Sequence, residues 1–298
     1  MKRKSETQQD IRKKKQYKLN KMENIDTTYC KNILKELLEK PLIKQRTTEW
    51  FNLRKDRLTA SDLHDAIKNP YSLVKRKMKG TTFNSSGIPA LKWGTMFEAM
   101  AIRIYSHIKK TKIYEFGLII NDEIENFGAS PDGITDEGKM IEIKCPYSRK
   151  IIDGNIPEKY YYQIQGQLAV CKLYKCDYIE CEFITYETEK EYLESNVESD
   201  NYLHGIIAEK KINGEFVYIY SKENQTCDDN IKEMNRYTEE KYKLNYWKLE
   251  IINIQEVDFD KEKWNNFIID KIKTYNSIYF KEKKNQDSIN LFIDEDKD

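Results

Sequence analysis

The stretch from Gly128 to Pro146, GASPDGITDEGKMIEIKCP, constrains this chain more than any other part of it. It contains Asp132, then a short turn, then the run around Glu142 and Lys144. A strand places alternate side chains on one face, so Glu142 and Lys144 point the same way. With Asp132 on the neighbouring strand of a hairpin, three charged groups converge on one patch. Carboxylates of this kind bind a hard cation such as Mg²⁺, and a lysine beside them neutralises charge and holds an attacking water.

A solvated hairpin with a surface salt bridge is the plainer interpretation of these three charges, because the pattern D…ExK is common by chance. Their neighbours argue against it, since they indicate a strand that is buried on one face: Ala129, Pro131, Ile141, Ile143 and Cys145. Acidic groups that face a concave surface cost free energy unless a cation or another partner offsets them. The sequence therefore favours a functional site over a surface hairpin.

Periodicity and turn residues predict helices first, then a cluster of strands, then a helix and a further strand. After residue 187 the pattern is mostly helical, with strands at 215–220 and 247–257. This order predicts an α+β, or mixed α/β, domain with a central sheet flanked by helices. The helices are expected at residues 29–42, 48–55, 62–68, 94–110 and 157–172, and the strands at 112–121, 127–134, 139–145 and 177–185.

The chain is expected to form one domain over residues 26–285, with a core at about 47–185 and a helical C-terminal extension at about 187–285. Residues 1–25 are rich in lysine and arginine and predict a disordered basic tail, while residues 286–298 predict an acidic tail. The basic tail is most simply a solubilising arm; a nuclear-targeting signal and a DNA tether are the functional alternatives. Neither a membrane-spanning apolar run nor an apolar signal segment is evident, which predicts an intracellular protein without a membrane partner.

Composition excludes several other classes of function. The net charge of +1 leaves nucleic-acid binding open, because local clustering matters more than the sum. The six cysteines contain no CxxC pair and are expected to be reduced, and the spacing of Cys171, Cys176 and Cys181 is poor for zinc. Three scattered histidines lack a nucleophile partner, and no GxxxxGK[ST] loop is present, which excludes a His-based nucleophilic mechanism and ATP-driven work. Trp50 and Trp93 are expected in the core.

Four further residues are candidates because of their surroundings. Glu98 lies on an expected helix between apolar residues. Considered alone, it is most simply an exposed glutamate; beside a two-carboxylate metal site, it becomes a candidate third carboxylate. Gln163 shares a helix face with Gln167 and is equally consistent with a ligand-orienting amide and with a polar helix surface. Arg57 and Ser61 precede a helix start, a geometry that suits a phosphate, although an N-cap and a surface arginine are commoner there.

Five motifs stand in order along the chain: RLTAS at 57–61, WGTMFE at 93–98, GASPDG at 128–133, IEIKCP at 141–146 and YYYQIQ at 160–165. This set resembles the phage lambda-type exonuclease, or YqaJ-type viral recombinase, family of the PD-(D/E)xK nuclease superfamily. The resemblance implies a restriction-endonuclease-like core, with a central mixed sheet flanked by helices. It also implies Mg²⁺-dependent 5′→3′ digestion of double-stranded DNA in viral recombination, repair or genome processing, with Mn²⁺ as a substitute cation.

By position in the matching motifs, the resemblance implies that the metal is bound by Asp132, Glu142 and the main-chain carbonyl of Ile143. Glu98 would complete the acidic site as a further metal ligand, and Lys144 would assist the attacking water. The resemblance also implies double-stranded DNA as the partner and suggests a single-strand annealing protein as another. A viral protein of this kind is expected in the host cytoplasm, with the nucleus as the alternative that the basic tail offers.

The same resemblance implies that Gln163 lies in the active site. It also implies that the 5′ or scissile phosphate is bound by Arg57, Ser61 and Ser130. It leaves the oligomeric state open, because the ring-forming surfaces known in the family cannot be located in this sequence. An endonuclease or a structure-selective nuclease on the same core remains an alternative. A catalytically silent DNA-binding protein is a second alternative, disfavoured because the acids and the lysine are all present.

Overall fold

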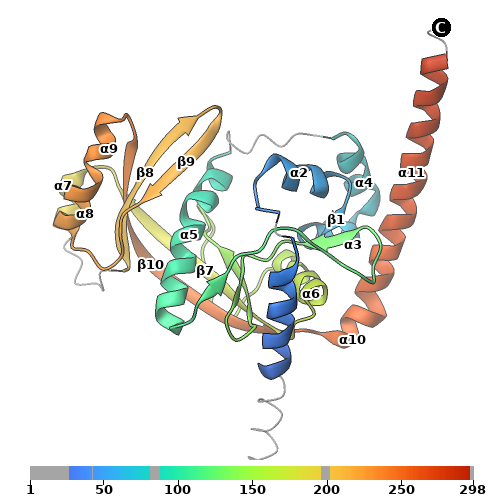
Figure 1. The fold of residues 1–298 in the computed structure, drawn as a ribbon, viewed down its shortest axis with the longest axis horizontal. Helices are drawn as coiled ribbons and strands as arrows, with labels where there is room; N and C mark the ends of the chain where they lie inside the picture. The colour runs from blue at the N-terminus through green and yellow to red at the C-terminus, as the bar shows by residue number, and fades with distance from the viewer. Residues whose placement is uncertain (1–26, 42, 81–87, 196–201, 296–298) are drawn as a thin grey trace, which may run out of the picture.

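The computed structural model describes residues 27–41, 43–80, 88–195 and 202–295 (Figure 1). The expected basic tail at 1–25 lies outside these ranges. Residues 286–295, expected to begin an acidic tail, instead continue the long helix α11 (Ile269–Glu295). None of the described helices is both long and apolar enough to cross a lipid bilayer.

A seven-stranded mixed sheet forms the centre of the molecule (Figure 1). Strands β6 and β7 pair in parallel, and the other neighbouring pairs of this sheet are antiparallel. The expected central mixed sheet flanked by helices is therefore confirmed. In spatial order its strands are β2 (Ile113–Tyr114), β5 (Gly133–Thr135), β6 (Met140–Lys144), β7 (Lys175–Tyr186), β10 (Lys243–Asp258), β8 (His204–Ile212) and β9 (Glu215–Tyr220).

Two helices cover opposite faces of the sheet beside β6. A parallel pair of strands needs a long crossover connection, and α6 (Glu158–Cys171) lies within the one between β6 and β7. The alternation along β6 divides its side chains between the helices. Ile141 and Ile143 pack in the cluster that contains α5 (Pro89–Lys109), whereas Met140 packs in the cluster of α6. Glu142, between the two isoleucines, consequently faces the α6 side.

A second, smaller sheet carries the segment that leads to Asp132. In it β4 (Phe127–Ala129) lies between β1 (Leu58–Thr59), to which it is parallel, and β3 (Ile119–Ile120), to which it is antiparallel. The one-turn helix η1 (Ala60–Asp62) follows β1 directly. Pairing of β1 with β4 thus brings the start of η1 beside the segment that follows β4.

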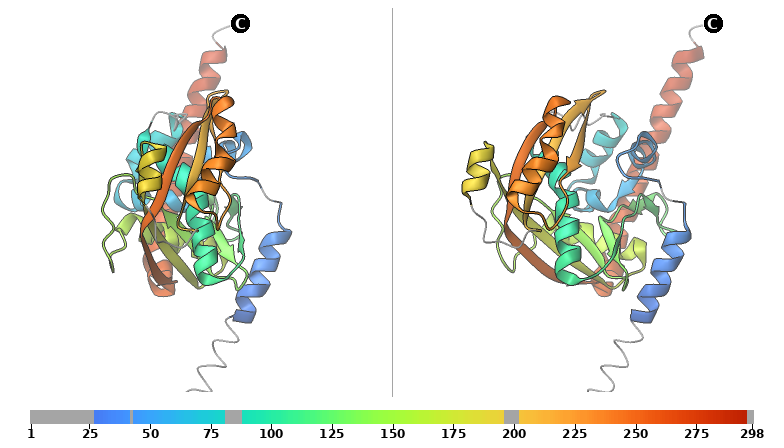
Figure 2. Two further views of the ribbon diagram at one scale, coloured as in Figure 1. Left: turned by 90° about the vertical axis from the view of Figure 1, so that its left-hand side faces the viewer. Right: turned by 60° about the vertical axis from the view of Figure 1, so that its left-hand side comes forward.

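The remaining helices enclose this sheet arrangement. Helix α11 packs against α3 and α4, and its C-terminal half extends beyond the rest of the molecule (Figures 1 and 2). The β8–β9 hairpin forms its own apolar cluster with α7 and α8. These helices are one at residues 27–39, α2 (Thr48–Lys55), α3 (Leu63–Lys68), α4 (Pro70–Met78), α7 (Glu189–Glu194), α8 (Cys227–Met234), α9 (Arg236–Glu239), α10 (Lys261–Lys263) and the π-helical turn η3 (Trp264–Ile268).

Three sequence-based expectations about the elements are wrong. The segment after residue 187 is not mostly helical: the expected strands at 215–220 and 247–257 are present as β9 and as part of β10, and the unexpected strand β8 joins them in the central sheet. The strands expected at 112–121 and 127–134 are each divided in two, since β2 and β5 join the large sheet while β3 and β4 join the small one. Asp132 therefore lies in the bend before β5 and not on a hairpin arm.

Candidate active site

A cavity of about 170 Å³ opens where α2, η1, α5, α6 and the bend between β4 and β5 meet. Its lining is mainly polar and includes three of the predicted carboxylate and glutamine residues. The lining residues are Gln45, Arg46, Trp50, Arg54, Ala60, Ser61, Glu98, Ser130, Asp132, Gln163 and Gln167.

Glu142 lies beside this cavity as a fully buried carboxylate with three side-chain donors. Lys144, two residues away on the same face of β6, forms an ion pair with it. Gln163 Nε2 and Gln167 Nε2 donate to its two oxygens at 2.6 and 2.7 Å. The sequence predicted that Glu142 and Lys144 face the same way and placed Gln163 and Gln167 on one helix face, but only Gln163 was chosen as a site residue, although Gln167 is the more buried of the two. These contacts offset the cost of burying the charge.

Asp132 faces the same place from the bend before β5. Its Oδ2 accepts a hydrogen bond of 2.7 Å from the backbone N–H of Ile143, which fixes Asp132 against β6. Burial, together with the carboxylates of Glu142 and Glu98, raises the pKa of Asp132 well above its ordinary value. Burial opposes the charge of Lys144 as well, but Glu142 and Asp132 outweigh it and raise the pKa of that lysine. The carboxylates therefore repel one another at Asp132, and a cation would relieve that repulsion.

Glu98 comes from α5 and is the third carboxylate of the site. Its Oε2 is 2.6 Å from Nη2 of Arg46, and the Glu98 side chain is 26% exposed. The structure thus places Glu98 within the cavity, as predicted from its position, but in an ion pair that sequence reasoning missed.

An arginine and two serines form one corner of the cavity. Arg54 Nη1 donates to Ser130 Oγ at 3.2 Å, and Arg54 Nη2 donates to Ser61 Oγ at 3.1 Å. Trp50 Nε1 donates to Ser130 Oγ at 3.0 Å, and the Arg54 guanidinium stacks over the Trp50 ring. Burial lowers the pKa of Arg54 from its ordinary value. This corner offers donors to an anion, as expected for Ser61 and Ser130, but its arginine is Arg54.

Arg57 does not reach the cavity. Its Nη1 donates to the carbonyl of Leu53 at 2.9 Å, and its side chain packs beside Gly128. The reason is helical geometry: Arg54 shares a face of α2 with Trp50, whereas Arg57 follows the end of that helix. The structure thus separates Arg57 from Ser61.

Ser61 is also not the N-cap that the sequence predicts. Thr59 caps η1 through a reciprocal pair of interactions with Asp62, so the Ser61 hydroxyl is left to face Arg54. Gly166 of α6 permits this arrangement. A Cβ at Gly166 would lie 2.5 Å from Leu63 Cδ1 and 3.0 Å from Ala60 Cβ, so only a glycine lets α6 approach η1 this closely.

The number of carboxylates in the cavity is compatible with the way proteins bind Mg²⁺. No three His, Cys, Asp or Glu side chains within the described ranges are close enough together to enclose a metal ion. Mg²⁺ commonly uses only one or two carboxylates and keeps waters and substrate phosphates as its other ligands. Asp132 and Glu142 could provide two such carboxylates, and the raised pKa of Asp132 reflects a charge repulsion that a cation would relieve.

Three cationic side chains, including Lys144, lie close to the Tyr160 ring. The distances to the ring centroid are 4.9 Å from Lys144 Nζ, 5.9 Å from Arg149 Cζ and 4.5 Å from Lys159 Nζ. Arg149 also pairs with the buried Glu180. We call Tyr160 and these three cations the Tyr160 cluster. An aromatic ring among cations is typical of surfaces that bind nucleic-acid backbones.

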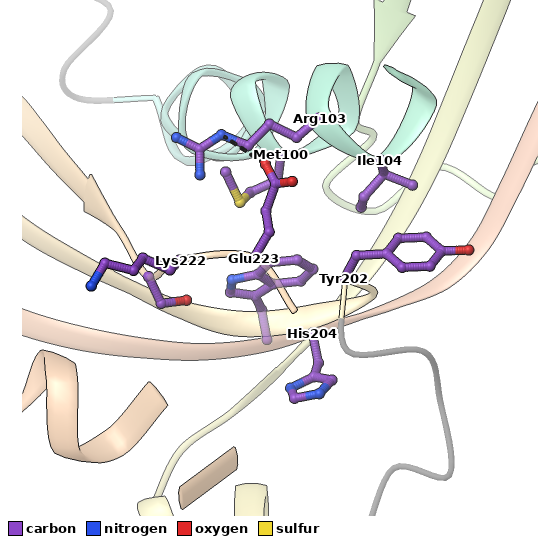
Figure 3. A pocket seen from close by; sticks show the side chains of 9 residues that line it. Met100, Arg103, Ile104, Tyr202, His204, Lys222 and Glu223 are labelled. Carbon is purple, nitrogen blue, oxygen red and sulfur yellow. Dashed lines mark ion pairs between the residues drawn. The ribbon is translucent and has the colours of Figure 1, made fainter. Parts of the chain in front are cut away.

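A second cavity lies between α5 and the start of β8 (Figure 3). Its volume of about 10 Å³ has room for roughly one water. Arg103 and Glu223 pair across it with 3.7 Å between Nε and Oε1, and His204 Nδ1 lies 2.7 Å from the Tyr192 hydroxyl. Burial lowers the pKa of His204. Since this cavity is so small and its charges are paired, the larger cavity is the candidate active site.

Two comparisons with known proteins found relatives of this chain. Residues 49–174 match the family model of the YqaJ-like viral recombinase domain. An uncharacterized protein of Acanthamoeba polyphaga mimivirus is 27% identical over 179 residues, which cover 52% of this chain. That alignment spans 32% of the mimivirus protein, so this chain corresponds to about a third of its relative's length.

Solved structures share the fold. The alkaline exonuclease LHK-Exo of Laribacter hongkongensis matches with a TM-score of 0.52 at 18% identity, covering 83% of this chain and all of the exonuclease. The same enzyme in complex with dAMP matches with a TM-score of 0.51 at 19% identity, and this match also covers 83% of this chain and all of the exonuclease chain. The fold of this chain is thus similar to that of this alkaline exonuclease, and its residues 49–174 match the YqaJ-like viral recombinase domain model.

Proposed function

We propose that this protein is a Mg²⁺-dependent deoxyribonuclease that digests double-stranded DNA from its 5′ ends. The observation that carries the proposal is the convergence of Asp132, Glu142 and Lys144 beside a cavity with an arginine–serine corner. The family match and the alkaline-exonuclease fold support it. Mn²⁺ is expected to substitute for Mg²⁺.

The reaction is the hydrolysis of a phosphodiester: water adds to phosphorus, the bond to the 3′ oxygen breaks, and that oxygen leaves with a proton. A divalent cation at Asp132 and Glu142 would supply Lewis-acid stabilisation of the phosphate charge. Lys144 acts as a donor in this scheme, because its raised pKa keeps it protonated and unable to serve as a base. Its ammonium orients the attacking water and offsets charge that develops on the phosphate.

The glutamines have a positioning role in this scheme. Gln163 and Gln167 donate to different oxygens of Glu142, so they fix the plane of that carboxylate. Gln167 also donates to the carbonyl of Ser130 at 3.3 Å and thereby links Glu142 to the arginine–serine corner. Distances between catalytic groups and a bound phosphate are consequently set by α6.

The arginine–serine corner is the proposed receptor for a terminal 5′ phosphate. Arg54, Ser61 and Ser130 present donors in the same cavity that Asp132 lines. A phosphate anchored there would place the next phosphodiester toward the carboxylates. The product released from a 5′ end would then be a nucleoside monophosphate, and the complex of LHK-Exo with dAMP is consistent with that expectation.

A digestion assay on linear, nicked and closed-circular duplex tests the activity, with Mg²⁺ in one series and a chelator in the other. Loss of linear and nicked duplex only, and only with Mg²⁺, would support the exonuclease. Cutting of closed circles would favour an endonuclease on the same core. A mobility shift without digestion in Mg²⁺ or Mn²⁺ would favour a DNA-binding protein without catalytic activity.

A biological role follows as part of the same proposal. Digestion from 5′ ends leaves 3′ single strands, which a single-strand annealing protein would use in viral recombination or repair. The match to a viral recombinase domain and to a mimivirus protein supports a role in an infected host cell. Co-purification with an annealing protein from infected cells would test the partnership.

A further inference from the structure

Arg46 stands just outside the segment that matches the family model and reaches into the candidate site. It has a φ of 66°, in the left-handed region, which a residue other than glycine adopts where its surroundings impose it. From this turn before α2 the guanidinium extends to Glu98 at 2.6 Å.

The turn itself is fixed to the site. The side-chain amide of Gln45 donates to the carbonyl of Phe116 at 2.7 Å and to that of Pro131 at 3.0 Å, one residue before Asp132. The chain just before it lies directly against backbone, because a Cβ at Gly117 would be 1.6 Å from the carbonyl oxygen of Ile43. Arg46 is therefore held near the carboxylates by its own backbone, and its long side chain is the adjustable part.

Each of the three carboxylates has a different partner. Glu142 is surrounded by Lys144 and two glutamines, and Asp132 accepts from the N–H of Ile143. Glu98 has Arg46 on its Oε2. While that contact persists, the guanidinium competes with a cation for this oxygen.

The ion pair of Arg46 with Glu98 is exposed enough for a cation to replace Arg46 at the Glu98 carboxylate. The Arg46 and Glu98 side chains are 46% and 26% exposed, and ion pairs of this exposure contribute little to stability. A divalent cation carries twice the charge of the guanidinium and favours carboxylate oxygen. A released guanidinium in the same cavity is suited to a phosphate, since its planar fork matches two phosphate oxygens.

We propose that Arg46 is the counter-ion of Glu98 in the cation-free protein and passes to a DNA phosphate when a divalent cation engages Glu98. Arg46 would thereby couple cation binding to substrate binding. This inference rests on the proposed function, since it takes the cation and the DNA from it.

The first test measures cation binding without DNA and without catalysis. Mn²⁺ is titrated by calorimetry into the wild-type protein and into Arg46→Gln, Arg46→Lys and Asp132→Asn variants. Arg103→Gln is the matched control, because Arg103 lies on α5 and pairs with Glu223 away from the site. We expect Arg46→Gln to bind Mn²⁺ at least five-fold more tightly than wild type, Arg46→Lys to lie between them, and Arg103→Gln to match wild type.

Unchanged or weaker Mn²⁺ binding by Arg46→Gln would overturn the inference. If Asp132→Asn still weakens Mn²⁺ binding in that case, the proposed metal site stands and only the role of Arg46 fails. If the wild type does not bind Mn²⁺, or if the Asp132→Asn variant binds it as tightly as the wild type does, both proposals fail.

The second test measures DNA affinity in a chelator with Glu98→Gln, which frees Arg46 without a cation. A 5′-phosphorylated duplex is expected to bind Glu98→Gln about ten-fold more tightly than wild type. In the double variant with Arg46→Gln this gain is expected to disappear. A gain that persists in the double variant would arise from lost repulsion alone and would overturn the transfer of Arg46 to phosphate.

Discussion

Arg54 Nη1 lies 3.2 Å from the hydroxyl of Ser130, and Ser130 precedes Asp132 by only two residues. The short segment from Ser130 to Asp132 therefore links the donor corner to the acidic site. A phosphate bound at Arg54 would lie at a fixed distance from the carboxylates, which is the property that end-directed cleavage requires.

Replacing Arg54 by alanine should remove the preference for 5′-phosphorylated ends. The physical reason is the loss of a charge-assisted donor pair for one specific group. The measurement is the initial digestion rate on two duplexes that differ only in the 5′ phosphate. Arg57→Ala is the matched control, because that side chain is bound to the Leu53 carbonyl outside the cavity. If Arg54→Ala lowers the digestion rate of both duplexes by the same factor, Arg54 would instead have a structural role and no specific contact with the 5′ phosphate.

Replacing Lys144 by methionine should lower the turnover rate by about 10²–10³ while leaving DNA affinity nearly unchanged, since removal of one preorganised donor has that effect. Methionine keeps the length of the side chain without its charge. Single-turnover rates at saturating protein separate turnover from binding. A variant within a few-fold of wild type would make Lys144 a structural partner of Glu142 only.

The raised pKa of Asp132 predicts a pH-dependent stability effect. A carboxyl whose pKa is higher in the folded state stabilises the fold while it is protonated. This contribution to the free energy of unfolding is lost as the pH rises from the pKa in the unfolded chain, about 4, through the pKa in the folded protein. Without a cation, Asp132→Asn should thus have a higher melting temperature than wild type at pH 7. Near pH 3 the difference should vanish. A melting temperature at pH 7 that is equal to or below wild type in the asparagine variant would contradict this.

The Tyr160 cluster predicts a salt-dependent contact. Lys159→Ala should weaken binding of the duplex and reduce the slope of log affinity against log salt by about one, as expected when one phosphate contact is lost. Lys190, which pairs with Glu194 on α7, provides a control lysine. Equal slopes for Lys159→Ala and wild type would place the DNA elsewhere.

The pairing of Glu142 with Lys144 was predictable because it depends on local geometry. Alternation along one short strand puts Glu142 and Lys144 on the same face whatever the rest of the chain does. The expected helix at 48–55 was confirmed for the same reason, since a cap and a turn of periodicity suffice to define it. Asp132 was placed near them correctly although its strand was not, because the bend before β5 serves as well as a hairpin arm.

Features that depend on distant contacts were not predictable. Choosing Arg54 over Arg57 requires knowing which face of α2 meets Ser130, 76 residues away along the chain. Strand β8 was missed because its buried first half does not alternate and its side chains meet neighbours from β9 and β10. The pair of Arg46 with Glu98 joins residues 52 apart and leaves no sequence pattern.

Hydrolysis of a 5′-phosphorylated linear duplex by Asp132→Asn and by wild type, with Mg²⁺ and with a chelator, tests the central claim most directly. Wild type should release nucleotides only with Mg²⁺. The asparagine variant, shown to be folded by circular dichroism, should be inactive, because it lacks a charged oxygen that the cation needs. Mg²⁺-dependent release by the folded Asp132→Asn protein at a rate near that of wild type would contradict the assignment of this site.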